Sequence, residues 1–457
     1  MPDAAPRDIA LRALGDRAGN ITAHLDRLLA SAGLSDADRA LARELALGVT
    51  RRRKTCSVIA RAFLTRPDQK LPRVVAAILE MAVYQVLFLD RVPAFAAVNE
   101  AVEQVARKGH PRMRGLVNAV LRSLQRCLQE PADGPCPMQP DAVAVDATRW
   151  IPLARPLFAD PQKDPAAWLA QQYSLPRALV DRWLHHVGSA REVAAVGAHG
   201  ITRAPLILRV NTLRGDLTMA LETLAGQDIA ARPHENGQSL VLDSSVSLTD
   251  LAAFRAGLIQ PQDPAATAVG AACRARPGSN VLDFCAAPGT KTTHLAEQMG
   301  NRGSIVALDV SAEKTSRIEE NCRRMGIDIV RTALAESAGG LDPESFDLVL
   351  ADVPCSNTGV LSRRAEARWG FEPKVLSTLA EDQKFLIRAA AGFVKPGGTL
   401  VYSTCSIEPE ENEQVVAYLL RQDKGMTLKT QKRTLPGGAA DPTRWHDGGF
   451  CAVLNRR

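Results

Sequence analysis

The sequence predicts three kinds of structure in chain order: an all-α N-terminal domain, a small α+β subdomain and a doubly wound α/β domain with a Rossmann-like sheet. Apolar residues recur at helical spacing in the first part, a proline-rich stretch follows, and strand-like runs alternate with helical segments beyond Asn280. The 457 residues are too many for one core of ordinary size. We therefore expect domains at 1–130, 166–265 and 266–457, with a linker at 131–165.

The N-terminal part is predicted to be helical from residue 8 to residue 128 and to carry excess positive charge. Residues 1–130 contain 21 Lys and Arg against 13 Asp and Glu, whereas the whole chain has a net charge of +6. The basic residues concentrate at Arg51–Lys54 and Arg107–Arg114. A basic helical domain favours a polyanionic partner such as RNA or DNA, although solvated helix ends remain the alternative for each cluster.

Residues 131–165 contain eight prolines and few periodic apolar positions, which is typical of a linker over the surface. A helix near 166–195, a strand at 204–211, a helix at 217–226 and a second strand at 239–242 are expected next. These elements predict the small α+β subdomain.

The C-terminal part alternates apolar strand-like runs with helical segments, which predicts right-handed βαβ units and a mostly parallel sheet. Ligands bind such sheets outside the carboxyl ends of the strands, near the switch point. The predicted strands are Val281–Phe284, Ser304–Asp309, Phe346–Asp352 and Thr399–Ser403.

Polar residues follow the ends of these strands. Asp309 ends the second strand, where a carboxylate can accept both hydroxyl protons of a nucleoside ribose; capping of the next helix is the alternative. The loop Cys285–Lys291 lacks the dinucleotide fingerprint GxGxxG. Its Pro288-Gly289 pair suits a close backbone approach to a ligand with a small cationic centre.

Nine cysteines form an odd set without a CxxC pair, which excludes a disulfide framework and the usual zinc spacings. Four of them are expected to be packing residues, namely Cys56, Cys127, Cys273 and Cys322. Cys355 and Cys405 differ, because each leaves a strand into a polar loop, the first of them beside Asp352 and Pro354. This setting favours chemistry at these two thiols.

Three loops carry a resemblance to a known family. The motifs Asp283–Lys291, Asp352–Ser356 and Tyr402–Asn412 resemble signature motifs of the RNA 5-methylcytosine methyltransferases that use S-adenosylmethionine. The helical N-terminal domain resembles the antitermination factor NusB, and Arg209–Arg214 resembles a strand of the family's small subdomain. The combination resembles the ribosomal RNA small-subunit methyltransferase B type, with a class I methyltransferase domain at its C-terminus.

The resemblance implies roles for individual residues. Cys405 would be the nucleophile that adds to C6 of cytosine, Cys355 would assist release of the product, and Asp352 would hydrogen-bond the base. It implies no metal. The implied cofactor-binding residues are Cys285, Ala286, Ala287, Pro288, Gly289, Thr290, Lys291, Asp309 and Asp352.

This sequence departs from the family pattern at three positions. Thr290 stands where the first loop usually has a second glycine, and Asn357 stands for the glycine after Pro-Cys-Ser. Asn tolerates positive φ better than most residues. Leu334 falls about where the family has an adenine-binding aspartate, so that contact is either absent or supplied by Glu336.

These observations predict an S-adenosylmethionine-dependent enzyme that methylates C5 of a cytosine in small-subunit ribosomal RNA. The alternatives are an enzyme of the same family acting on transfer RNA or large-subunit RNA, and a non-catalytic RNA-binding or antitermination factor with a relict fold. No secretory signal or membrane-length apolar run is visible in the sequence. We expect a cytoplasmic monomer that binds RNA and neither a membrane nor a metal.

Overall fold

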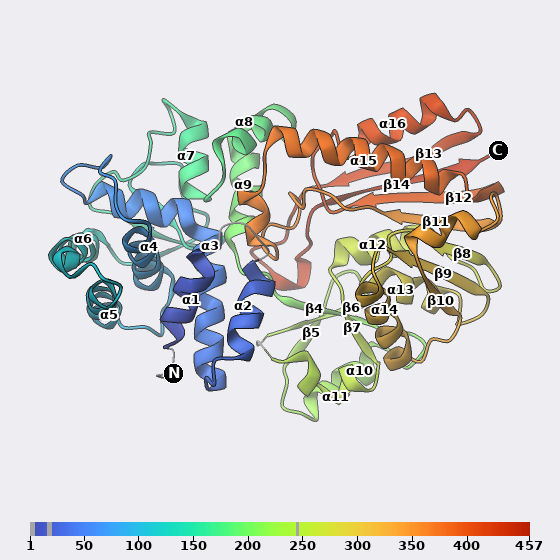
Figure 1. The fold of residues 1–457 in the computed structure, drawn as a ribbon, viewed down its shortest axis with the longest axis horizontal. Coiled ribbons are helices and arrows are strands. Elements are labelled where there is room, and N and C mark those ends of the chain that lie inside the picture. Colours follow the sequence, from blue (N-terminus) through green and yellow to red (C-terminus); the bar gives the residue numbers. More distant parts are fainter. Residues whose placement is uncertain (1–4, 16–20, 244–245) are drawn as a thin grey trace. The chain divides into compact units, whose positions relative to one another are not determined.

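The computed structural model describes residues 5–15, 21–243 and 246–457 (Figure 1). Residues 1–4, part of the segment in which no secretory signal was visible, lie outside the described residues. The chain divides into two compact units: Met1–Arg203 with Leu361–Phe371, and Ala204–Val360 with Glu372–Arg457. This division is coarser than the four segments expected from the sequence, whose boundaries stay a prediction.

The first unit begins with helices, as predicted for the N-terminal domain. Their apolar faces form its core, in which side chains such as Leu45, Ile78 and Leu121 are fully buried. Ser35 caps the longest helix, because its side chain accepts a hydrogen bond from the backbone N–H of Asp38. The helices are α1 (Pro6–Gly15), α2 (Ile21–Ala30), α3 (Asp36–Ala62), α4 (Arg73–Phe88), α5 (Ala94–Arg107) and α6 (Arg114–Cys127).

The proline-rich segment contains short strands rather than loop alone. β1 (Ala132–Asp133), β3 (Arg149–Pro152) and β2 (Ala142–Ala144) form a small antiparallel sheet in that order. Strands of two to four residues leave no alternation long enough to detect in a sequence. Three helices follow in place of the single predicted one: α7 (Pro165–Gln172), α8 (Arg177–His186) and α9 (Ala190–Ile201).

The segment Leu361–Phe371 belongs to the first unit although it lies between residues of the second. Arg368 on its short helix η4 (Ala365–Trp369) is fully buried and donates hydrogen bonds to carbonyl oxygens. Burial lowers the pKa of Arg368 to about 9. The acceptors within the unit include the carbonyl groups of Arg51, Tyr173, Gly200, Leu361 and Ala365.

The structure assigns most of the first basic cluster to internal contacts. Arg52 is 2% exposed and donates to the carbonyl oxygens of Ala144 and Val145, and Lys54 donates to that of Leu175. The phosphate-binding interpretation of Arg51–Lys54 is therefore wrong for Arg52. A regular helical spacing does not reveal which face of α3 is covered by a later part of the chain.

The second basic cluster lies on the surface. Arg107 and Arg114 are about half exposed and pair with Glu100 and Glu103, and Arg112 is exposed. Exposed ion pairs contribute little stability, so phosphate groups can compete for these arginines. The RNA-binding interpretation of Arg107–Arg114 stays a prediction.

A seven-stranded sheet dominates the second unit, in the order β10-β9-β8-β11-β12-β14-β13. The first five strands are parallel, and β14 is antiparallel to both of its neighbours. The predicted strand ends at Asp309 and Asp352 are confirmed. The strands are β8 (Asn280–Asp283), β9 (Ser304–Asp309), β10 (Val330–Leu334), β11 (Phe346–Asp352), β12 (Val394–Thr404), β13 (Met426–Thr434) and β14 (Gly449–Arg456).

Helices cover both faces of this sheet (Figure 1). One core joins it to α15 (Pro373–Ala391) and α16 (Glu413–Gln422). The core on the other face joins it to α12 (Pro264–Cys273), α13 (Thr290–Gln298) and α14 (Ala312–Met325). This arrangement confirms the doubly wound α/β fold.

The small subdomain of the second unit is an antiparallel sheet of order β5-β6-β4-β7 with helices on it. Its β4 carries Arg209, which is 1% exposed and forms an ion pair with Glu297 of α13. Arg209 also donates to the carbonyl oxygen of Thr290. The elements are β4 (Leu206–Val210), α10 (Leu217–Ala225), β5 (Ala231–Pro233), β6 (Ser239–Leu242), α11 (Ala252–Arg255) and β7 (Ile259–Pro261).

Among residues 5–15, 21–243 and 246–457, no helix is both long enough and apolar enough to cross a membrane.

Candidate active site

The predicted site residues lie at the carboxyl edge of the large sheet, in the second unit. The chain runs from β8 outward to β10 in one direction and from β11 to β12 in the other, so the switch point lies between β8 and β11. Asp352 ends β11, and Cys405 directly follows β12. The register pairs Asp352 with Ser403, one residue before the end of β12. The adjacent strand ends therefore bring the two predicted catalytic groups together.

The thiols of Cys355 and Cys405 lie in contact. The Cys355 loop (Val353–Gly359) and the Cys405 loop (Cys405–Asn412) place the two Sγ atoms 3.1 Å apart. The hydrogen bond with Cys405 and burial both raise the pKa of Cys355 well above its ordinary value. Cys355 is therefore a thiol at neutral pH and can donate its proton toward the sulfur of Cys405.

Asn357 also touches the predicted nucleophile. Its φ of 61° is the left-handed conformation, as expected from its place at a family glycine. Its amide nitrogen donates to the carbonyl oxygen of Cys355 at 2.8 Å, and its Oδ1 lies 3.2 Å from Sγ of Cys405. The sequence indicated the backbone role of Asn357 but not this contact.

Asp352 lies between Lys291 and Ser403. Its Oδ2 accepts from Nζ of Lys291 and its Oδ1 accepts from the Ser403 hydroxyl, each at 2.5 Å. Burial lowers the pKa of Lys291, but the Asp352 carboxylate outweighs it and holds the pKa above its ordinary value. Lys291, expected on the cofactor side, thus supports the carboxylate beside Cys405.

The loop after β8 is tied to Asp309. The backbone N–H of Ala287 donates to Oδ2 of Asp309 at 2.9 Å, and Oδ1 accepts from the N–H of Val310 and from Lys314. Burial raises the pKa of Asp309, but the combined lowering by these donors is larger. The pKa therefore lies below its ordinary value. Ser311, not Asp309, is the N-cap residue of α14, and the helix-cap alternative is wrong.

The geometry around Asp309 fits a nucleoside cofactor. A carboxylate has about four lone-pair positions, and the three protein donors leave one, which is enough for one ribose hydroxyl and not for the two that were expected. Val310 beside it is 74% exposed, which offers an apolar surface next to the ribose position. Leu334 ends β10 opposite Asp309, and Glu336 is exposed on the short helix that follows.

Gly289 makes a close approach, but to protein. It has a φ of 93°, and a Cβ there would lie 3.1 Å from the Ile318 side chain of α14. The loop therefore packs closely on α14, and its close approach to a ligand stays a prediction. Thr290, the departure from the family pattern, is the first residue of α13.

A cavity of about 640 Å³ opens at the predicted catalytic residues. Cys405, Asp352 and Lys291 line it, whereas Cys355, Asp309 and the loop 285–290 do not. His234 of the small subdomain and Lys432 of β13 also line it, and neither was found from the sequence. No motif pointed to them, because their place depends on the packing of the subdomain against the sheet.

The remaining cysteines of this unit are poor nucleophiles. Burial raises the pKa of Cys285 and of Cys322 to about 12, that of Cys451 to about 11 and that of Cys273 well above its ordinary value. Cys56, Cys127, Cys273 and Cys322 are all buried, as expected for packing residues.

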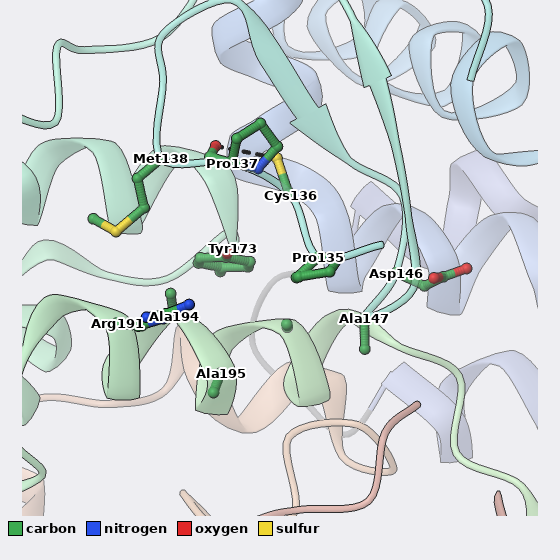
Figure 2. A pocket seen from close by; sticks show the side chains of 11 residues that line it. Pro135, Cys136, Pro137, Met138, Asp146, Ala147, Tyr173, Arg191, Ala194 and Ala195 are labelled. Carbon is green, nitrogen blue, oxygen red and sulfur yellow. Dashed lines mark hydrogen bonds between the residues drawn. The ribbon is translucent and has the colours of Figure 1, made fainter. Parts of the chain in front are cut away.

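A second cavity, of about 600 Å³, lies within the first unit (Figure 2). Figure 2 shows Tyr173 between the segment 135–138 and the helix that carries Arg191. Burial raises the pKa of Cys136 in its wall to about 12. The other lining residues are Pro135, Pro137, Met138, Asp146, Ala147, Ala194, Ala195 and Ala198.

The fold and the strand-end site define an S-adenosylmethionine-dependent methyltransferase. Residues 272–442 match the family described as 16S rRNA methyltransferase RsmB/F, residues 4–126 match the NusB family, and residues 175–249 match the ferredoxin-like domain of RsmF/B-like methyltransferases. The chain belongs to the 16S rRNA methyltransferase RsmB/F family and is an RNA methyltransferase.

Curated relatives match over nearly the whole chain. The probable ribosomal RNA small subunit methyltransferase B of Bacillus subtilis is 32% identical over 95% of this chain and 92% of its own length. The ribosomal RNA small subunit methyltransferase B of Erwinia tasmaniensis is 31% identical over 92% of this chain and 90% of its own. The order of all three domains is thus shared with these relatives.

Solved structures share the fold. The crystal structure of PH0851 has a TM-score of 0.73 at 23% identity and covers 100% of this chain and 99% of its own. A methyltransferase homolog protein from Pyrococcus horikoshii has a TM-score of 0.55 at 25% identity and covers 64% of this chain and 99% of its own.

Proposed function

We propose that this protein transfers a methyl group from S-adenosylmethionine to C5 of a cytosine in small-subunit ribosomal RNA through a covalent bond between Cys405 and C6. The observation that carries this proposal is the placement of Cys405 beside the Lys291–Asp352 pair in one cavity at the switch point. A nucleophile and a carboxylate that can hold the pairing edge of a base meet there.

Cytosine C5 is a poor nucleophile and needs activation. The Cys405 thiolate adds to C6, and the electron pair of the C5–C6 double bond becomes available at C5. When bound, S-adenosylmethionine supplies the electrophilic methyl group. Asp352 hydrogen-bonds N3 and the exocyclic amine, where the ring must accommodate charge, and Lys291 holds that carboxylate in place.

Release requires the removal of one proton from C5. A base takes this proton, the C–H electron pair re-forms the C5–C6 double bond, and the C6–S bond breaks with its electrons returning to Cys405. Cys355 is suited to be this base, because its sulfur lies 3.1 Å from that of Cys405. It acts as a thiolate once its own proton has passed to solvent, and the C5 proton restores the thiol.

Residues at the ends of β8 and β9 would hold the cofactor. Asp309 has a free lone-pair position for a ribose hydroxyl, and Val310 offers an apolar surface for the adenine. The backbone of Cys285–Thr290 lies beside Asp309 through the Ala287 hydrogen bond. Lys291 and Asp352 continue this edge toward the cavity.

The choice of small-subunit ribosomal RNA is supported by the names of the relatives from Bacillus subtilis and Erwinia tasmaniensis. We place the activity in the cytoplasm, where ribosomal RNA is assembled. Aromatic residues are only 4% of the sequence, so stacking platforms are scarce. We therefore expect a target cytosine that is already unpaired, since extrusion from a helix costs a few kcal/mol.

The test is methylation by the purified protein with methyl-labelled cofactor. Bare 16S-type RNA, large-subunit RNA and transfer RNA are the substrates, and the modified base is mapped in each. We expect 5-methylcytosine in the 16S-type RNA alone. Label in another base would contradict the chemistry, and label only in transfer RNA or large-subunit RNA would contradict the substrate.

A further inference from the structure

The Cys355 loop is fastened to the Cys405 loop by a buried carboxylate of the Tyr402–Asn412 motif, Glu411, for which the sequence indicated no role of its own. Glu411 is 0% exposed, and its Oε1 accepts from the backbone N–H of Ser356 at 2.8 Å. Its Oε2 accepts from the Ser356 hydroxyl at 2.5 Å. Both oxygens of the carboxylate are thus used on the residue that follows Cys355.

A third donor extends the link to α15. The amide nitrogen of Gln383 donates to Oε1 of Glu411 at 2.9 Å and to the carbonyl oxygen of Pro354 at 2.8 Å. The hydroxyl of Tyr402 donates to the backbone carbonyl of Glu411 at 2.6 Å. Pro354 and Ser356, on either side of Cys355, are therefore held by Gln383 and Glu411 respectively. These two side chains are hydrogen-bonded to each other.

A buried carboxylate without a cationic partner is costly. Within the part of the chain that the structure describes, no Lys or Arg forms an ion pair with Glu411, so only neutral donors compensate its charge. An amide could make similar hydrogen bonds at lower cost. The position of this charge close to Cys355 therefore points to the reaction.

We propose that Glu411 is a positioning residue that holds Cys355 against Cys405 for the release step. This inference rests on the proposed function. The negative charge of Glu411 is also one of the influences that raise the pKa of Cys355, after the hydrogen bond with Cys405, burial and the charge of Cys405. When the pKa of a thiol is raised, its thiolate binds a proton more strongly. Such a thiolate is a stronger base for the C5 proton than an ordinary cysteine thiolate.

The test separates methyl transfer from release in the full-length protein with an RNA that contains the target cytosine. Glu411→Ala should leave single-turnover methyl transfer within about 3-fold of the parent and slow multiple turnover by about 30-fold. A protein–RNA complex should accumulate on a denaturing gel. We expect the same of Cys355→Ala, which lacks the base that removes the C5 proton. A purely structural loss would lower both rates together and trap no complex, which would overturn the proposal.

Conservative and matched variants complete the experiment. Glu411→Gln can accept from the Ser356 N–H and donate to its hydroxyl, so it should recover the part of the turnover that depends on the position of Cys355. It should stay slower than the parent, because the negative charge near Cys355 is lost. Glu381→Ala, which removes a 72% exposed carboxylate from the helix that carries Gln383, should behave as the parent. If Glu411→Ala does not fold, Ser356→Ala removes one of the two bonds from Ser356 and should show a smaller effect of the same kind.

Cys355→Ala distinguishes a wrong role for Cys355 from a wrong role for Glu411. If Cys355→Ala traps no complex, the release role of Cys355 in the proposed function is wrong. If Cys355→Ala traps the complex and neither Glu411→Ala nor Ser356→Ala does, only the role of Glu411 is wrong.

Discussion

The cavity beside Cys405 and the cavity beside Cys136 have volumes of about 640 and 600 Å³, and each has a cysteine in its wall. In the first, an ion pair between Lys291 and Asp352 lies with the cysteine at the ends of parallel strands. In the second, the thiol of Cys136 lies 3.6 Å from the carbonyl oxygen of its neighbour Pro137, and prolines and alanines form most of the wall.

The course of the backbone, more than the volume of a cavity, determines where reactive side chains come together. Parallel strands that end at one edge deliver polar side chains to one place from segments far apart in the sequence. A cavity among helices and loops has no such common edge, so the packing alone determines which side chains line it. Matched substitutions in the two regions can test this contrast.

The largest effect is expected at the two cysteines. Cys405→Ala should lower single-turnover methylation by about 10⁴-fold or more, because no bond to C6 can form, while cofactor binding persists. Cys136→Ala should change the rate by less than about 2-fold. Quenched-flow methylation and calorimetric cofactor binding measure both. Full activity of Cys405→Ala would remove the assigned nucleophile.

The thiol of Cys136 should resist alkylation. With a pKa of about 12 it is protonated at pH 8, so its thiolate fraction is about 10³-fold below that of an ordinary cysteine, whose pKa is near 8.5. Each unit of pH above 8 should raise its labelling by iodoacetamide about 10-fold. Mass spectrometry of the Cys136 peptide measures the rate. Equal labelling of native and urea-unfolded protein at pH 8 would contradict the shift.

Carboxylates in the two cavities should also differ. Asp352→Asn should slow single-turnover methylation by about 10²-fold and weaken RNA binding far less, because the charge matters most as the ring accepts the thiolate. Asp146→Asn in the other cavity should leave the rate unchanged, since Asp146 accepts bonds from Thr148 in a turn. A loss confined to RNA affinity in Asp352→Asn would make it a binding residue only.

Cofactor affinity should depend on Asp309 and not on the second cavity. Asp309→Ala should weaken binding of S-adenosylmethionine by about 10-fold, the loss of one charge-assisted hydrogen bond. Arg191→Ala is the matched removal of a charge from the second cavity and should have no effect. Titration calorimetry measures the affinity of both variants for S-adenosylmethionine. Unchanged affinity in Asp309→Ala would show that Asp309 does not bind the ribose.

The smallest effect is expected on the surface of the first unit. Replacing Arg112 and Arg114 by Ala should weaken RNA binding a few-fold and reduce its log-log salt dependence by about 0.7 to 0.9 per lost phosphate contact. Arg177→Ala removes a similarly exposed arginine of the same unit. Binding measured between low and moderate salt gives the slopes. Identical slopes for the parent, the double variant and Arg177→Ala would show that the cluster makes no phosphate contacts and is only a solvated surface.

Much of the second unit could be predicted from the sequence. The runs that end at Asp309 and Asp352 are strands with those bounds, because in each a series of apolar residues, 305–308 and 348–351, directly precedes the aspartate. The positive φ of Asn357 was also indicated, since few residues tolerate that conformation. Local patterns carry this information.

Contacts between distant segments could not be predicted. The bonds from Ser356 and Gln383 to Glu411, the support of Asp352 by Lys291, and the burial of Arg52 all join residues whose separation in the sequence leaves no local pattern. From the sequence alone, a charged residue on a helix such as Arg52 is expected to be exposed, because the segment that covers it is not known. Tertiary packing decides such cases.

The return of Leu361–Phe371 to the first unit has a consequence for synthesis of the protein. Residues 204–360 must be made between Arg203 and this segment, which takes roughly 10 to 30 s at typical rates of about 5 to 20 residues per second. Until Arg368 emerges, the carbonyl oxygens of Arg51, Tyr173 and Gly200 lack its guanidinium group as a hydrogen-bond donor. The N-terminal unit is thus completed on the ribosome only after the strand that ends at Asp352 has been made.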